Sequence, residues 1–112
     1  MQLRRGKLAF GITRDELNAW KRKVSNGEIA FITHYWYDRR FPQYTTVTKV
    51  GCSSIEKLKK WGKRYNLRAD WIHQGEYPHF DLIGKRQFEI LQKEGLHIHI
   101  QKFNLTQNLK NN

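Results

Sequence analysis

Residues 28–38, with the sequence EIAFITHYWYD, decide the fold that we expect for this chain. From Ile29 to Thr33 every side chain is apolar or β-branched, so both faces of an extended chain would favour burial over exposure to water. That pattern is typical of a strand that is covered on both sides. Pro42 then interrupts the pattern, because proline cannot donate to a sheet, and the β-branched residues of 45–51 predict a second strand.

Helices are expected on either side of these two strands. Thr13 and Glu16 have the spacing of a capping box, which predicts that a helix begins there. Ser53 and Glu56 have the same spacing and predict a second helix. A third helix is predicted over about residues 83–94.

Two further segments carry strand patterns. Residues 96–102 alternate between apolar and polar side chains, which predicts a half-buried strand, and residues 71–73 predict a brief one. The expected fold class is α/β, a single small domain with about three helices packed on a three- to four-stranded sheet. Because helices separate the strands, we expect at least one right-handed parallel crossover.

The length of 112 residues suits one domain and is too short for two. We expect a basic N-terminal arm over residues 1–11, a single α/β domain over residues 12–103 and a polar C-terminal tail over residues 104–112. The lone cysteine, Cys52, excludes an intramolecular disulfide. The sequence has neither the apolar run of a signal peptide nor that of a membrane span, so we expect a cytoplasmic protein.

Charge is the strongest global feature of the sequence. Its 21 Lys and Arg residues against 10 Asp and Glu residues give a formal net charge of +11 and a pI near 10.0. Such an excess attracts polyanions and speeds their encounter with the protein. Nucleic acid is therefore the expected partner, contacted by these basic residues: Arg39, Arg40, Lys57, Lys60, Lys63, Arg64, Lys85 and Arg86.

Three side chains are candidates for acid–base or metal chemistry. Asp38 follows the 28–38 strand at its carboxyl end, where α/β proteins bind ligands. His79 and Asp81 are two residues apart in an extended segment, so they point the same way and can reach one ion or one phosphate. Structural roles stay open for all three: Asp38 can cap a turn, and Asp81 can cap the third helix with His79 orienting the cap.

A second group of candidates is weaker. His97 and His99 share one face of the strand predicted over 96–102, so they can bind a metal together or lie on an exposed edge strand. The sequence lacks a Gly-rich phosphate loop and the motifs Gly-x-Ser-x-Gly, Cys-x-x-Cys and His-Glu-x-x-His. These absences argue against standard nucleotide hydrolysis, serine hydrolysis, zinc fingers and zincin chemistry.

Two short runs within residues 53–96 carry a family resemblance: Trp71-Ile72-His73-Gln74 and Pro78-His79-Phe80-Asp81-Leu82. They resemble a small family of bacterial and phage proteins known only as a domain of unknown function. The whole chain is also similar to uncharacterised short Bacillus-type proteins. The resemblance implies no activity, but it places the Pro78–Leu82 segment and Asp38 in one candidate site. After Asp38 the chain departs from the family pattern, since Arg39-Arg40-Phe41 replaces a more acidic continuation.

Three functions are compatible with these features. The first is a basic nucleic-acid-binding protein. The second is a metal-dependent phosphodiesterase or nuclease, in which Asp38, His79 and Asp81 act as ligands of a divalent ion or as general base. The third is a non-enzymatic adaptor that binds an acidic protein partner, with His79 and Asp81 purely structural.

Overall fold

The computed structural model describes residues 11–105 of the chain. Three strands form one antiparallel sheet in the order β1-β2-β3, and helices cover it, so the α/β class predicted from the sequence is confirmed. In chain order, the elements are α1 (Arg14–Ser25), β1 (Ala30–Tyr35), β2 (Thr46–Gly51), α2 (Ile55–Lys63), the 3₁₀ turn η2 (Ala69–Trp71), β3 (His79–Leu82), α3 (Gly84–Lys93) and α4 (His97–Lys102).

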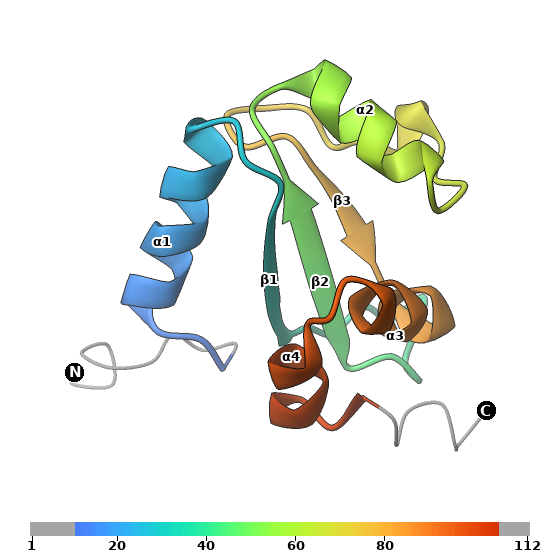
Figure 1. Cartoon of the computed structure of the whole chain (residues 1–112). Coiled ribbons are helices and arrows are strands. Elements are labelled where there is room, and N and C mark those ends of the chain that lie inside the picture. Colours follow the sequence, from blue (N-terminus) through green and yellow to red (C-terminus); the bar gives the residue numbers. More distant parts are fainter. Residues whose placement is uncertain (1–10, 106–112) are drawn as a thin grey trace.

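The helices divide between the two faces of the sheet. α1 lies on one side, α3 and α4 lie on the other, and α2 crosses the end at which β2 finishes (Figure 1). On the α1 side, a Cβ atom added to Gly51 would lie 2.7 Å from the Trp20 ring, which shows how closely that helix approaches β2. On the opposite side, Gln87 of α3 donates to the hydroxyl of Thr48 in β2.

The caps of the first two helices explain where these helices begin. Thr13 and Glu16 form the predicted capping box, in which each side chain accepts from the backbone N–H of the other. α2 is capped by Ser54 rather than Ser53, since Ser54 Oγ accepts from the backbone N–H of Lys57. The polar side chains thus satisfy N–H groups that no helical turn can reach.

The main core lies between the sheet and α2. Phe31, Val50 and Phe80 are register partners across the three strands and point to the same face. The Trp61 ring packs edge-on against Phe31 and at a tilt against Phe80, with centroid distances of 5.7 and 6.0 Å. Gly62 allows this approach because it presents only backbone to the Phe80 ring.

A polar chain crosses the same face of the sheet beside this core. Thr33 and Thr48 are cross-strand partners whose hydroxyls lie 2.7 Å apart. Gln87 donates to Thr48 and accepts from Thr46, and all four side chains are at most 2% exposed. Because each buried polar group has a partner, the chain holds α3 on the sheet without leaving a group unsatisfied.

The predicted parallel crossover is wrong, since both strand pairs are antiparallel. After β2 the chain runs outward along α2 and then returns through η2, so it re-enters the sheet at the end where β2 leaves it (Figure 1). Residues 75–78 form a loop that leads into β3. The brief strand predicted over 71–73 is a 3₁₀ turn followed by a single bridge between His73 and His79.

The strand predicted over 96–102 is also wrong, because α4 occupies these residues. Leu96, Ile100 and Phe103 pack into the core, and their spacing of four and three fits one face of a helix. Ile98, which a strand would have buried beside Leu96 and Ile100, is 75% exposed. Over so short a segment, alternating apolar and polar side chains fit a half-buried strand and a short helix equally well. The sequence pattern therefore did not distinguish the two.

Most of the two expected terminal segments lies outside the described residues, which begin at Gly11 and end at Leu105. Leu105 itself is buried in the cluster that also holds Phe103 and Ile12. Within the described part of the chain, no helix combines the length and apolar character needed to cross a membrane.

We predict that Gly62→Ala destabilises the protein by about 1 kcal/mol or more. A methyl group would lie 2.7 Å from Phe80 Cζ, and overpacking of this kind costs about 1–3 kcal/mol, which outweighs the gain of about 1 kcal/mol in helix propensity. Urea unfolding measures the change, and Lys59→Ala on the exposed side of α2 is the control, expected to stay within about 0.5 kcal/mol of wild type. A Gly62→Ala variant as stable as its control would contradict the packing described.

Candidate functional site

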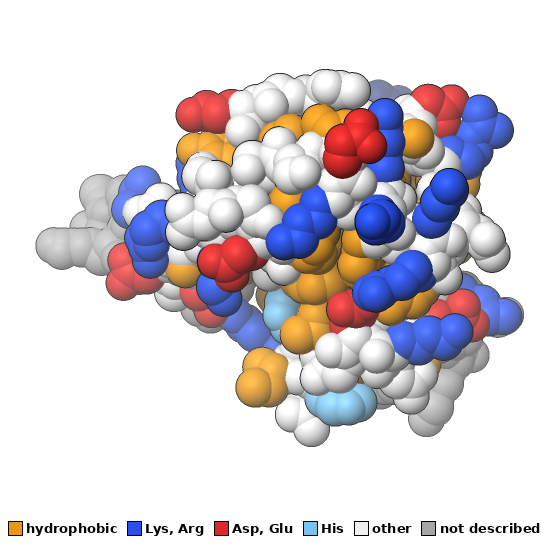
Figure 2. Space-filling model, turned by 45° about the horizontal axis from the view of Figure 1, so that its top comes forward, with side chains coloured by type: hydrophobic (Ala, Val, Ile, Leu, Met, Phe, Trp, Pro, Cys, Tyr) orange, Lys and Arg blue, Asp and Glu red, His pale blue; other side chains and the backbone are white. Residues whose placement is uncertain are grey.

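Basic side chains gather over α2 and α3. Figure 2 shows most of the Lys and Arg side chains of this face on the right of the view, over these two helices and beside an apolar hollow. The α2 residues Lys57, Lys60 and Lys63 are exposed. Lys57 is partly engaged, because its ammonium group donates to the carbonyl of Gly27 at 2.8 Å.

A groove between the end of α2 and α3 collects most of the other predicted cations. It has a volume of about 480 Å³, and its lining includes Arg64, Lys85, Arg86 and Lys93. We call it the basic groove. Arg64 is compensated by Glu94, but no carboxylate among the described residues pairs with Lys85, Arg86 or Lys93.

Glu94 is hydrogen-bonded to two residues that line the basic groove, Arg64 and Tyr65. Its carboxylate accepts from the Trp61 indole at 3.1 Å, from the Arg64 guanidinium and from the Tyr65 hydroxyl. Burial and the neighbouring carboxylate raise the pKa of Tyr65. These bonds fix α2 against α3, so the walls of the groove are held at a set separation.

A second hollow of about 620 Å³ adjoins the basic groove, and both are lined by Arg86. The guanidinium of Arg86 lies over the ring of Trp71, 5.1 Å from its centroid, and Trp71 is 42% exposed. Arg40 and Phe41 line the far side of this hollow, where the guanidinium of Arg40 lies over the Phe41 ring. Cations and aromatic rings therefore alternate along one continuous surface.

Asp38 lies in the loop between β1 and β2, where it is tied to Arg40. Its two carboxylate oxygens accept from the Arg40 guanidinium, at 2.9 and 2.6 Å, and Oδ1 also accepts from the Arg40 backbone N–H. These bonds lower the pKa of Asp38 to about 2. Asp38 therefore caps a turn, the structural role that the sequence left open for it. The described residues show no contact that joins it to His79 or Asp81.

The structure does bring His79 and Asp81 together, on a part of the sheet that α1 leaves open. Both belong to β3 and share one face, and Asp81 stands opposite Lys49 of β2. The Cys52 N–H bond to the Pro78 carbonyl sets the alternation of the ladder, which makes the Lys49–Asp81 pair non-hydrogen-bonded, the kind whose side chains lie closest. Lys49 Nζ accordingly donates to Asp81 Oδ1 at 3.0 Å.

His73 completes this group, which we call the polar cluster: Lys49, His73, His79 and Asp81. Two backbone hydrogen bonds join His73 to His79, and their rings stack with centroids 5.1 Å apart. His73 Nε2 lies 3.0 Å from Asp81 Oδ2. The polar cluster borders the second hollow through His73 and Asp81, so it lies at the end of the basic and aromatic surface.

Hydrogen bonding fixes the protonation of His79. Its Nδ1 lies 2.8 Å from the Tyr77 carbonyl, which only accepts, so Nδ1 carries the proton. Nε2 then carries the lone pair of the neutral ring and lies 3.4 Å from Lys49 Nζ and 3.5 Å from Asp81 Oδ1. Burial lowers the pKa of His79, and the charge of Lys49 lowers it further, so this ring is a neutral acceptor at pH 7.

The alternative in which Asp81 caps the third helix is wrong. The N-cap of α3 is Ile83, which makes no side-chain cap bond, and Asp81 lies two residues earlier within β3. Lys49 and His73 were not among the predicted site residues. Lys49 is recognisable in the sequence as a charged side chain among the β-branched residues of a predicted strand. Its pairing with Asp81, however, depends on strand register, which the sequence pattern does not determine.

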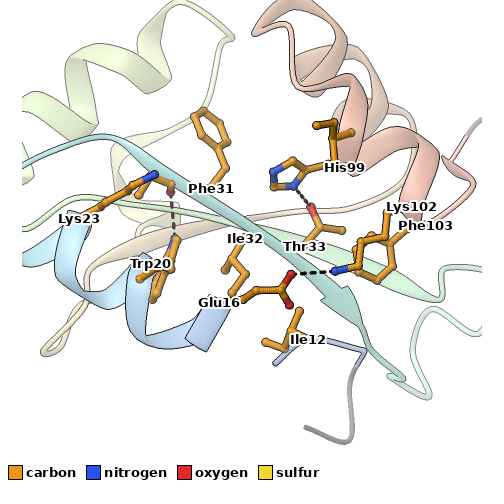
Figure 3. Close-up of a pocket in the computed structure, with 13 residues that line it drawn as sticks. Ile12, Glu16, Trp20, Lys23, Phe31, Ile32, Thr33, His99, Lys102 and Phe103 are labelled. Carbon is orange, nitrogen blue, oxygen red and sulfur yellow. Dashed lines mark hydrogen bonds and ion pairs between the residues drawn. The ribbon is translucent and has the colours of Figure 1, made fainter. Parts of the chain in front are cut away.

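His97 and His99 do not share a strand face, since both belong to α4. His97 is exposed, whereas His99 lines a cavity of about 270 Å³ between α1, β1 and α4. Figure 3 shows two contacts between residues that line this cavity. His99 Nδ1 lies 2.9 Å from the Thr33 hydroxyl, and Lys102 donates to Glu16. Burial lowers the pKa of His99.

Among the described residues, no group of three or more His, Cys, Asp and Glu side chains is arranged to hold a metal.

The chain is similar to a protein of Bacillus subtilis (strain 168) with the name "Uncharacterized protein YneQ". The two are 54% identical over 99 residues, which cover 88% of this chain and 100% of the relative. The chain belongs to the YneQ family. No protein-family model and no solved structure matches it. The similarity to a Bacillus-type protein expected from the sequence is therefore confirmed, and membership of the YneQ family by itself assigns no activity.

We predict that Asp81→Asn changes the free energy of unfolding by less than about 1 kcal/mol. The side chain is about one-third exposed, and ion pairs screened by water contribute about 0–1 kcal/mol. Urea unfolding at pH 7 measures the difference. A loss above about 2 kcal/mol would show instead that Asp81 is a structural residue of the sheet.

Proposed function

We propose that the protein binds single-stranded nucleic acid along the basic groove and the adjoining second hollow. The observation that carries this proposal is Arg86, which lines both hollows, lacks a carboxylate partner among the described residues and lies over the half-exposed Trp71. Arginine and lysine contacts to phosphates supply affinity for any sequence, and exposed aromatic rings stack on unpaired bases. A cytoplasmic setting, in which Cys52 stays a thiol, accords with this proposal.

Single strands are favoured over duplexes by the aromatic side chains on the surface. Trp71 and Phe41 lie in the second hollow, between the cations of the basic groove and Arg40. A duplex hides its base faces, whereas a single strand offers one face for each ring. A preference for single strands therefore goes beyond the simple attraction that a net charge of +11 has for every polyanion.

The two other functions have less support from the geometry. A metal-dependent phosphodiesterase would need Asp38 beside His79 and Asp81, but Asp38 is bound by Arg40. An adaptor for an acidic protein would use the same cations without needing Trp71. Association with a protein that survives nuclease treatment and is unaffected by Trp71→Phe would favour the adaptor.

We predict that the double variant Lys85→Ala/Lys93→Ala weakens binding to single-stranded RNA or DNA and reduces its salt dependence. Each lost phosphate contact lowers the slope of log K against log salt by about 0.7 for single strands. Fluorescence anisotropy of a labelled oligonucleotide, titrated at several salt concentrations, measures both quantities. The control Arg14→Ala/Arg22→Ala removes the same charge from exposed positions on α1 and is expected to keep the slope. Equal slopes in both variants would place the binding surface elsewhere.

We predict that Trp71→Phe reduces the quenching of tryptophan fluorescence by a bound single strand, because the other described tryptophans are less exposed. A parallel titration with duplex of the same sequence is expected to quench less than the single strand. If quenching is identical in wild type and variant, Trp71 does not contact the bases and the stacking part of the proposal fails.

A further inference from the structure

We propose that the polar cluster cleaves RNA bound on the basic groove, by acid–base catalysis that uses the RNA's own 2′-hydroxyl and no metal ion. This inference rests on the proposed nucleic-acid binding and assigns an activity to its far end. The surface leads there directly, because Arg86 lines the basic groove and the second hollow, and His73 and Asp81 line that same hollow.

His79 is the general base. Its Nδ1–H is held by the Tyr77 carbonyl, so Nε2 is the atom that can take a proton. Lys49 Nζ, at 3.4 Å, and Asp81 Oδ1, at 3.5 Å, now lie beside this atom, and Lys49 moves to a phosphate oxygen when substrate binds. The ring is packed edge-on against Trp20, with centroids 6.4 Å apart, which holds its orientation. A base that is neutral and oriented in this way matches the requirement for proton abstraction at neutral pH.

His73 is the general acid. Its Nε2 lies 3.0 Å from Asp81 Oδ2, which accepts the Nε2 proton, and its side chain is 60% exposed. Within residues 11–105 no hydrogen bond occupies its Nδ1 atom, so Nδ1–H can reach a leaving oxygen. The 5.1 Å stacking distance brings the two imidazoles within reach of the same phosphodiester group.

Lys49 supplies the charge that the transition state needs. Its ammonium is held by Asp81 at 3.0 Å and is 30% exposed, so it can also contact a non-bridging phosphate oxygen. Negative charge develops on these oxygens during transfer, and a cation in contact with them stabilises the transition state. Asp81 is a positioning residue, because it holds both Lys49 and His73 without touching the substrate.

The step balances without an external reagent. His79 Nε2 takes the proton of the 2′-hydroxyl as its oxygen forms a bond to phosphorus, and the bond from phosphorus to the 5′-oxygen breaks. His73 gives its proton to that 5′-oxygen. The products are a 2′,3′-cyclic phosphate and a 5′-hydroxyl end, and exchange with water restores both histidines. DNA lacks the nucleophile, so it is bound and not cleaved.

The test uses the full-length protein and three oligonucleotides of one sequence: RNA, 2′-O-methyl RNA and DNA. In the presence of EDTA we expect cleavage of RNA only, with cyclic phosphate ends identified by mass spectrometry, and binding of all three. His73→Gln and His79→Gln are each expected to lower the cleavage rate about 100-fold or more while binding of 2′-O-methyl RNA stays within about twofold. His97→Gln, the same substitution at an exposed site on α4, is expected to cleave like wild type.

The pH profile gives a second readout. Because cleavage needs neutral His79 and protonated His73, we expect a bell-shaped dependence of kcat/KM. Burial lowers the pKa of His79, so the acid limb lies below the usual histidine value of about 6.5. His79→Gln removes this limb even in a fold of reduced stability, which thermal melting reports separately. The groups that face His79 are Lys49, Asp81, His73, Trp20 and Tyr77. Glu76 lines a separate hollow that Lys49 and His79 also border.

Each failure has a distinct meaning. Binding of 2′-O-methyl RNA without cleavage of RNA overturns this inference and leaves the proposed function intact. Absence of binding overturns both. Cleavage that EDTA abolishes, or that persists unchanged in both His73→Gln and His79→Gln, overturns the assignment of the polar cluster.

Discussion

The contact between the Phe80 ring and the backbone of Gly62 is the constraint on which the rest of this structure depends. It joins β3 to α2, and Trp61 extends the contact to Phe31 of β1, so one aromatic cluster spans two strands of the sheet and the helix above it. Such close packing leaves no room for even one methyl group at Gly62. The contact also ties α2 to β3, which runs antiparallel to β2.

The same strand register separates the roles of the two faces of the sheet. Val50 and Phe80 lie on the face covered by α2 and α3, and the residues that alternate with them, Lys49 and Asp81, lie on the face toward α1. One face is closed by α2, α3 and the buried chain from Gln87 to Thr33. The other is covered only in part by α1, which leaves charged and imidazole groups of neighbouring strands side by side at an accessible position. A rigid core on one face thus positions polar side chains on the other.

The candidate site was predictable in pieces. The spacing of His79 and Asp81 indicated that they point the same way, and the structure places them on one face of β3. The cations of α2 and α3 were visible from composition, but the groove that joins Arg64 to Lys85 and Arg86 depends on how the two helices pack. Asp38 was grouped with His79 on the family resemblance, which placed Asp38 and the Pro78–Leu82 segment in one candidate site. Its neighbour Arg40 binds it instead, since a contact two residues away forms with little loss of entropy.

By itself, the sequence determined the features that are local: the capped start of α1, the strands from Ala30 and from Thr46, and the excess of positive charge. Tertiary structure decided the sense of β3, the helical state of His97–Lys102 and the meeting of Lys49 with His73. The physical reason is that helix caps and alternation act over a few residues, whereas these outcomes depend on which apolar surfaces remain to be buried once the sheet has formed. Leu96, Ile100 and Phe103 bury their side chains in the core because they lie on one face of a helix.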